Sequence, residues 1–148
     1  RGLHNRGDVS VVGLEPANPL HAIDGLKYLR TGEHYHPTTY DESVLDGKLY
    51  VDTGDAYDRA RDLRTRYSTE NPRVVDTGQY DPGFVADHLR VEGQFVVGTS
   101  SGAGVCAAEQ LHEEHGLTAD DTVVIILCDR GDKYADIPLW DDYLSVES

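Results

Sequence analysis

The chain has 148 residues, of which 39% are hydrophobic, and its 27 acidic and 13 basic residues give a formal net charge of -14 at pH 7. This length suits one domain or part of one, and the negative balance argues against a nucleic-acid partner. The longest apolar run, residues 123–128, is far too short to cross a membrane. We interpret the acidic surplus as adaptation to high intracellular salt, where screening damps self-repulsion, rather than as ordinary cytosolic acidity.

The chain opens on Arg1 in a polar stretch without a visible signal peptide, so we expect it to begin within a longer protein. Two cysteines, Cys106 and Cys128, lie in apolar segments without metal-type spacing. We expect both to be buried free thiols in a reducing cytoplasm, and a disulfide is the alternative.

The first third of the chain predicts two strands and a short helix. Residues 9–14 form an apolar run that stops at Glu15-Pro16, as a buried strand does at a proline. Residues 21–29 place their apolar side chains roughly on one face, which predicts a short helix. Residues 49–51 predict a second short strand.

A longer helix should follow, with Thr53 as its cap, because a hydroxyl can accept hydrogen bonds from the free N–H groups of the first turn. Its apolar residues recur at the spacing of one helical face: Ala56, Ala60, Leu63 and Tyr67. Residues 68–87 are rich in turn signals and predict a surface insertion.

The second half centres on a predicted strand-turn-helix. An apolar strand over residues 95–97 leads into Gly-Thr-Ser-Ser-Gly at 98–102 and then a small-residue helix over 103–115, ended by Gly116. Residues 122–127 have the continuous β-branched character of a parallel strand covered on both faces. Strands and helices alternate, which predicts the α/β class.

Ligands in such sheets bind where strands end and helices begin, so residues 98–102 are the first candidate site. A plain packing turn is the alternative. The turn also matches the G-x-S-x-G elbow of serine hydrolases around Ser100. The only later histidines, His112 and His115, lie on the following helix and cannot fold back to Ser100, which argues against a hydrolase. Their spacing also differs from the zinc motif, so no metal is expected.

The string VEGQFVVGTSSGAGVCAAEQL, residues 91–111, is similar to a segment of cysteine synthases and cystathionine β-synthases: EEG, an apolar strand, G-x-S-[SAT]-G-[AS] and an alanine-rich helix. VVGLEP, HAIDGLKYL, YVDTGDAYDRARDL and VVIILCDRGDKY resemble four other segments in the family's order. The chain thus resembles the C-terminal part of these pyridoxal 5'-phosphate (PLP) enzymes of fold type II, apart from an insertion at about 64–87 that the family generally lacks. The implied fold is the parallel-sheet sandwich of the tryptophan synthase β-like PLP-dependent enzymes, present here only as its C-terminal portion.

The resemblance places Ser100 against the pyridine nitrogen of PLP. A hydroxyl can donate to that nitrogen without protonating it, whereas a carboxylate would stabilise a pyridinium. The other residues implied on the cofactor side are Gly98, Thr99 and Ser101 in the pocket floor and Asp129 and Gly131 in a loop beside the ring. Gly25 is implied on the substrate side. For Asp129 and Gly131 a purely structural turn is an equal alternative.

The implied activity is β-replacement on an activated serine, O-acetylserine or O-phosphoserine, by sulfide or a thiol, in a cytoplasmic enzyme that is a homodimer when intact. A cystathionine β-synthase-like enzyme and a non-catalytic truncated α/β domain are the alternatives. The family's Schiff-base lysine is expected upstream of this chain. Lys27, Lys48 and Lys133 do not match its position and are expected to be surface lysines. The chain alone is therefore expected to be inactive.

Overall fold

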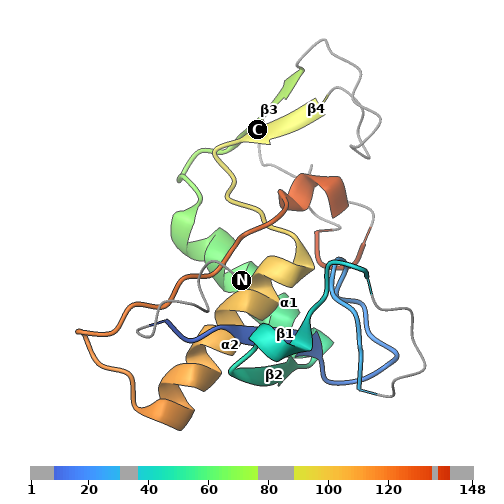
Figure 1. Ribbon diagram of the computed structural model, residues 1–148. Coiled ribbons are helices and arrows are strands. Elements are labelled where there is room, and N and C mark those ends of the chain that lie inside the picture. Colours follow the sequence, from blue (N-terminus) through green and yellow to red (C-terminus); the bar gives the residue numbers. More distant parts are fainter. Residues whose placement is uncertain (1–8, 31–36, 77–88, 135–136, 141–148) are drawn as a thin grey trace.

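The computed structural model describes residues 9–30, 37–76, 89–134 and 137–140. Within these ranges it contains two long helices that lie side by side, a parallel pair of strands against them and an antiparallel pair that projects at the top of the molecule (Figure 1). The predicted α/β class is confirmed. None of the helices in this described part is long and apolar enough to cross a membrane.

The parallel pair joins β1 (Val12–Pro16) to β2 (Gly47–Val51), with Leu14 opposite Leu49. Both strands were predicted, although β1 begins three residues later than expected and continues through Pro16. The ladder extends one residue further, because the amide of Ala17 donates to the carbonyl of Val51 at 2.9 Å.

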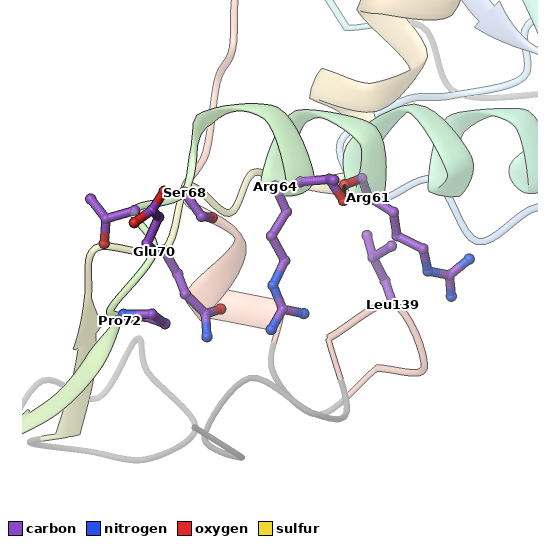
Figure 2. Close-up of a pocket in the computed structure, with 9 residues that line it drawn as sticks. Arg61, Arg64, Ser68, Glu70, Pro72 and Leu139 are labelled. Atoms are coloured by element: carbon purple, nitrogen blue, oxygen red, sulfur yellow. Dashed lines mark hydrogen bonds between the residues drawn. The ribbon is translucent and has the colours of Figure 1, made fainter. Parts of the chain in front are cut away.

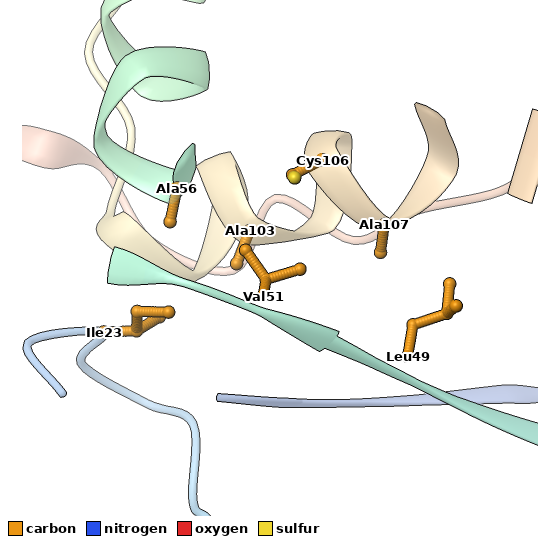
Figure 3. Close-up of a cluster of buried hydrophobic side chains, with 7 residues drawn as sticks. All are labelled: Ile23, Leu49, Val51, Ala56, Ala103, Cys106 and Ala107. Carbon is orange, nitrogen blue, oxygen red and sulfur yellow. The ribbon is translucent and has the colours of Figure 1, made fainter. Parts of the chain in front are cut away.

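The helices α1 (Thr53–Tyr67) and α2 (Thr99–His115) pack closely against each other. A side chain at Gly102 would overlap the carbonyl oxygen of Ala56, so the backbones meet where only glycine leaves room. The core beneath this contact joins both helices, β2 and the segment after β1 (Figure 3); its buried residues are Ile23, Leu49, Val51, Ala56, Ala103, Cys106 and Ala107.

The helix ends match the sequence only in part. Asp52, rather than Thr53, is the N-cap of α1, and the Thr53 hydroxyl instead accepts from the amide of Ala22 at 3.1 Å. The α2 helix starts at Thr99, four residues before the predicted boundary. Its predicted end is confirmed at Gly116, which adopts the left-handed conformation with φ 61°.

The short helix predicted over residues 21–29 is wrong. Side chains from other elements bind this segment instead: Thr53 accepts from the amide of Ala22, Thr99 from that of Asp24 and Glu15 from that of Leu29. Of these three amides only that of Leu29 would have an intrahelical acceptor in a helix that begins at residue 21. These residues therefore form turns and extended chain that are bound to β1, α1 and α2.

Part of the predicted insertion forms an antiparallel hairpin. The strands β3 (Arg73–Asp76) and β4 (Leu89–Glu92) pair with each other, and residues 77–88 lie outside the described ranges. The proposed start of the insertion at residue 64 falls inside α1. The strand expected over 95–97 is reduced to one antiparallel bridge between Val97 and Arg130.

The parallel strand predicted over residues 122–127 is also wrong. The segment is extended but forms no strand, and its apolar side chains are exposed. Cys128 is exposed as well, whereas Cys106 is buried as predicted. A β-branched run becomes a buried strand only where neighbours pair with it, and the described part of the chain places no strand beside this one.

Candidate functional site

The candidate site is the start of α2. Gly98 is the N-cap, with φ -66° and ψ 160°, and as a glycine it makes no side-chain cap bond. The first-turn N–H groups therefore have no acceptor on the N-cap side chain, and the helix dipole adds positive potential there. Ser100 is half-buried in this turn, between the fully buried Thr99 and Ser101. The Ser101 hydroxyl oxygen has no hydrogen-bond partner within the described residues.

Gly25 lies directly against Ser100. A Cβ built on Gly25 would be 3.6 Å from the Ser100 Oγ, and the φ of +86° at Gly25 is a conformation that side-chain-bearing residues rarely adopt. The hydroxyl of Thr99 holds this segment in place by accepting from the amide of Asp24 at 2.8 Å. The structure thus brings together the predicted substrate-side glycine and the predicted cofactor-side serine, which are far apart in the sequence.

Asp129 lies behind the turn, beside Gly98. The amide of Gly98 donates to the carbonyl of Asp129 at 2.9 Å. A Cβ on Gly98 would be 3.0 Å from the Tyr134 ring and 3.3 Å from the Asp129 Cβ, so glycine permits this close approach. Asp129 is therefore adjacent to the turn through its backbone.

The carboxylate of Asp129 is held by two donors. Lys133 Nζ lies 2.9 Å from Oδ1, and the Tyr134 hydroxyl donates to Oδ2 at 2.8 Å. Lys133 and then Tyr134 lower the pKa of Asp129, so this carboxyl is charged at neutral pH. Burial and the hydrogen bond to Asp129 raise the pKa of Tyr134 to about 12.

Gly131 has a structural role. A Cβ there would be 2.5 Å from the Trp140 Nε1 and 2.6 Å from the Val97 carbonyl oxygen. The indole N–H of the fully buried Trp140 donates to that carbonyl at 2.9 Å. This packing favours the structural-turn alternative for Gly131.

Two residues that support the site were missed by sequence reasoning. Tyr134 and Trp140 hold the turn from behind, through the bonds to Asp129 and to the Val97 carbonyl. The available signal was composition: Trp140 is the only tryptophan in the chain, and a lone large aromatic residue is often a core anchor.

Of the three lysines considered from the sequence, Lys48 and Lys133 are both paired with carboxylates. Lys48 lies 3.0 Å from Glu15 and 2.6 Å from Glu42, and its side chain is only 18% exposed. The surface-lysine prediction is therefore wrong for Lys48, because buried Glu15 requires a cation beside it. Glu42, Tyr40 and Glu15 raise the pKa of Lys48, which makes it a poor nucleophile at neutral pH. Lys133 pairs with Asp129.

A pocket of 640 Å³ opens elsewhere, at the C-terminal end of α1 (Figure 2). Its lining mixes both charges and includes Arg61, Arg64, Ser68, Glu70, Pro72 and Leu139. No predicted site residue lines it. Within the described ranges there is also no group of three or more His, Cys, Asp or Glu that could hold a metal ion.

The fold and site together define an α/β protein whose candidate ligand position is an uncapped helix start facing a glycine. No protein-family model matches the chain. It is 29% identical over 136 residues to a cysteine synthase of Aquifex aeolicus (strain VF5), and the match covers 91% of this chain and 33% of that protein. The resemblance to cysteine synthases is thereby confirmed.

Two solved structures are similar to this chain. A crystal structure of O-ureido-L-serine synthase matches with TM-score 0.59 at 26% identity, covering 93% of this chain and 36% of that one. A mutant of an O-ureido-L-serine synthase with O-ureido-L-serine bound matches with TM-score 0.60 at 26% identity, covering 93% and 35%. This chain therefore spans about a third of the length of these relatives.

Proposed function

We propose that this chain forms one wall of the PLP site of an enzyme that carries out β-replacement on an activated serine. The contact between Gly25 and Ser100 at the start of α2 is the observation that carries the proposal. It joins the two positions that the family resemblance assigns to substrate and cofactor. The relatives named cysteine synthase and O-ureido-L-serine synthase support an amino-acid substrate of the serine type.

The residues present fit one side of PLP. The cofactor, when bound, supplies an electron sink that eases removal of the α-proton and loss of the β-leaving group. Ser100 would donate a hydrogen bond from its hydroxyl to the pyridine nitrogen and, by keeping its proton, leave that nitrogen uncharged. Thr99 would keep Gly25 in place through Asp24, and the absence of a side chain at Gly25 would leave space beside the Ser100 hydroxyl.

We propose that the covalent anchor of the cofactor is a lysine outside this chain, as the family resemblance implies. Lys48 is paired with two carboxylates and Lys133 with Asp129, so neither offers a neutral amine to the site. We therefore propose that the chain acts together with a lysine-bearing polypeptide, and that the chain alone is inactive. The proposed product is cysteine, formed by sulfide from O-acetylserine or O-phosphoserine. A cystathionine β-synthase-like reaction with a larger thiol is the second candidate.

The test is Ser100→Ala in the complete enzyme that contains this chain. We expect a shifted absorption spectrum of bound PLP and slower release of the β-leaving group, because the ring nitrogen loses its donor. Ser43→Ala is the matched control, since Ser43 is exposed and bonds only to nearby Asp41 in the described part of the chain. An unchanged spectrum and rate in Ser100→Ala would refute the ring contact.

We also propose that the intact enzyme is a cytoplasmic homodimer adapted to high salt. The net charge of -14 supports the adaptation to high salt, because molar salt screens charge repulsion beyond about 3 Å. The urea concentration at which half of this chain is unfolded should rise when KCl is raised from about 0.1 M, where charge repulsion is weakly screened, to about 2 M, where it is strongly screened. An unchanged midpoint would contradict salt adaptation.

A further inference from the structure

Residues 122–128 form an exposed apolar segment, drawn in orange as an extended line without a strand arrow (Figure 1). The exposed fractions alternate along it: Val123 42%, Val124 83%, Ile125 38%, Ile126 77% and Leu127 41%. A period of two is the signature of a strand with one covered and one bare face. The less exposed face, whose side chains are still 38–42% exposed, lies near α2, because a Cβ on Gly104 would be 3.8 Å from the Ile125 Cβ.

Among the described residues, the only hydrogen bond to the backbone of this segment is a weak one from the Cys128 thiol to the Ile126 carbonyl at 3.7 Å. No backbone hydrogen bond joins residues 122–128 to any other residue that the structure describes. An extended apolar segment with unpaired N–H and C=O groups is a template for another strand. A bare face of this kind on a folded protein marks an interaction site.

We propose that residues 122–128 are the docking strand for the part of the relatives' fold that lies outside the third matched by this chain. The chain matches over 93% of its own length, but that match covers only 35% of the similar structure. A surface that is bare here can therefore be interior in a fold nearly three times as long. The occupant is an extended, β-branched segment of that remaining polypeptide, bound through main-chain hydrogen bonds and through the side chains of Val124 and Ile126.

Charge favours this occupant over a second copy of the chain. Residues 122–128 carry no charge, but Asp120, Asp121 and Asp129 flank them. A second copy would bring these carboxylates, and another net charge of -14, to the same edge. The proposal does not depend on PLP or on catalysis, so it can fail or hold separately from the proposed function.

The test uses the thiol of Cys128 as a built-in probe, because Cys128 is exposed at the end of the segment and Cys106 is buried. A chimera would replace the matching third of the A. aeolicus cysteine synthase with this chain. We expect a thiol reagent to label Cys128 quickly in the free chain and at least about tenfold more slowly in the chimera, with slower amide exchange over 122–128. Equal labelling and exchange in a folded chimera would overturn the proposal.

A second arm keeps the test decisive if the chimera does not fold. The remaining two thirds of that synthase would be added to this chain as a separate polypeptide, with labelling of Cys128 as the readout. Val124→Asp should abolish the protection, whereas Val74→Asp, the same change in the exposed β3 strand, should leave it intact. Absence of protection with the unsubstituted chain would also overturn the proposal. So would protection that rises with the concentration of this chain alone, because the occupant would then be a second copy.

Discussion

Gly25 and Ser100 face each other so closely that a Cβ on the glycine would lie 3.6 Å from the serine Oγ. That distance is ordinary van der Waals contact, so a methyl group fits there, but it occupies the space beside the hydroxyl. The backbone of Gly25, with φ +86°, adds a separate cost for any side chain. The two effects can be measured apart.

Gly25→Ala should destabilise the chain by about 1–2 kcal/mol through backbone strain alone. Gly116→Ala is the matched control, because Gly116 also has a positive φ, of 61°, and a Cβ there would meet nothing within 4 Å. Urea unfolding should show similar losses in both variants. Only Gly25→Ala should weaken PLP binding in the complete enzyme; equal PLP affinity in the two variants would remove Gly25 from the site.

Thr99→Val should release the segment that carries Gly25. The valine keeps the shape of threonine but removes the acceptor for the Asp24 amide, at a cost of about 1–2 kcal/mol. Amide exchange at Asp24 should become faster, and Thr99→Ser, which keeps the hydroxyl, should preserve the slow rate. If exchange at Asp24 is the same in the wild-type chain and Thr99→Val, the hydroxyl does not hold the segment.

Gly102→Ala should be the most damaging glycine substitution in α2. Its Cβ would overlap the Ala56 carbonyl, and forcing the helices apart should cost about 3 kcal/mol. Gly104→Ala lies on the same helix, where a Cβ makes only a 3.8 Å contact with Ile125. There the better helix propensity of alanine should be neutral or add up to about 1 kcal/mol. Thermal melts followed by circular dichroism would contradict this packing if the two variants behaved alike.

Lys48→Met should destabilise the chain by about 3 kcal/mol, because it leaves the Glu15 carboxylate buried without its cation. The exposed counterpart is Lys133→Met, which breaks the pair with Asp129 and should cost less than about 1 kcal/mol. Adding Glu15→Gln to Lys48→Met should recover part of the loss. Urea midpoints of the four proteins would test this order.

Stability should also fall at alkaline pH through Tyr134. Its pKa is raised to about 12 from the usual 10.0, by burial first and by the bond to Asp129 second. The folded state therefore holds this proton more tightly than the unfolded state, and the stabilisation is complete below about pH 10 and lost as the pH rises toward 12. Tyr134→Phe should flatten this part of the stability curve. An equal alkaline slope in both proteins would show that Tyr134 is not the group responsible.

The sequence predicted most reliably where local chemistry decides the outcome. The end of α2 at Gly116 and the burial of Ala56 and Ala60 on one face of α1 follow from rules that act within a few residues. Tyr67, predicted on the same face, is 64% exposed, because the face is covered only where α2 packs against it. The meeting of Ser100 with Gly25 was reached through the family resemblance, because no local pattern relates segments so far apart.

The failures share a different cause. Residues 21–29 had a helical pattern, but Thr53, Thr99 and Glu15 bind this segment as turns and extended chain. Residues 122–127 had the composition of a buried strand but no neighbour to pair with in the described part of the chain. Both outcomes depend on partners that are distant in sequence, and periodicity carries no information about them.

The close contact of α1 with α2 has a consequence for alignment as well as for stability. Each helix begins with a threonine. The Thr53 hydroxyl accepts a hydrogen bond from the amide of Ala22, and the Thr99 hydroxyl accepts one from the amide of Asp24, so both helix starts hold the segment that carries Gly25. The distance between these two helix starts is set one turn further along, where Gly102 packs against Ala56. A substitution that disturbs this packing would therefore misalign Gly25 with Ser100 while both helices remained folded.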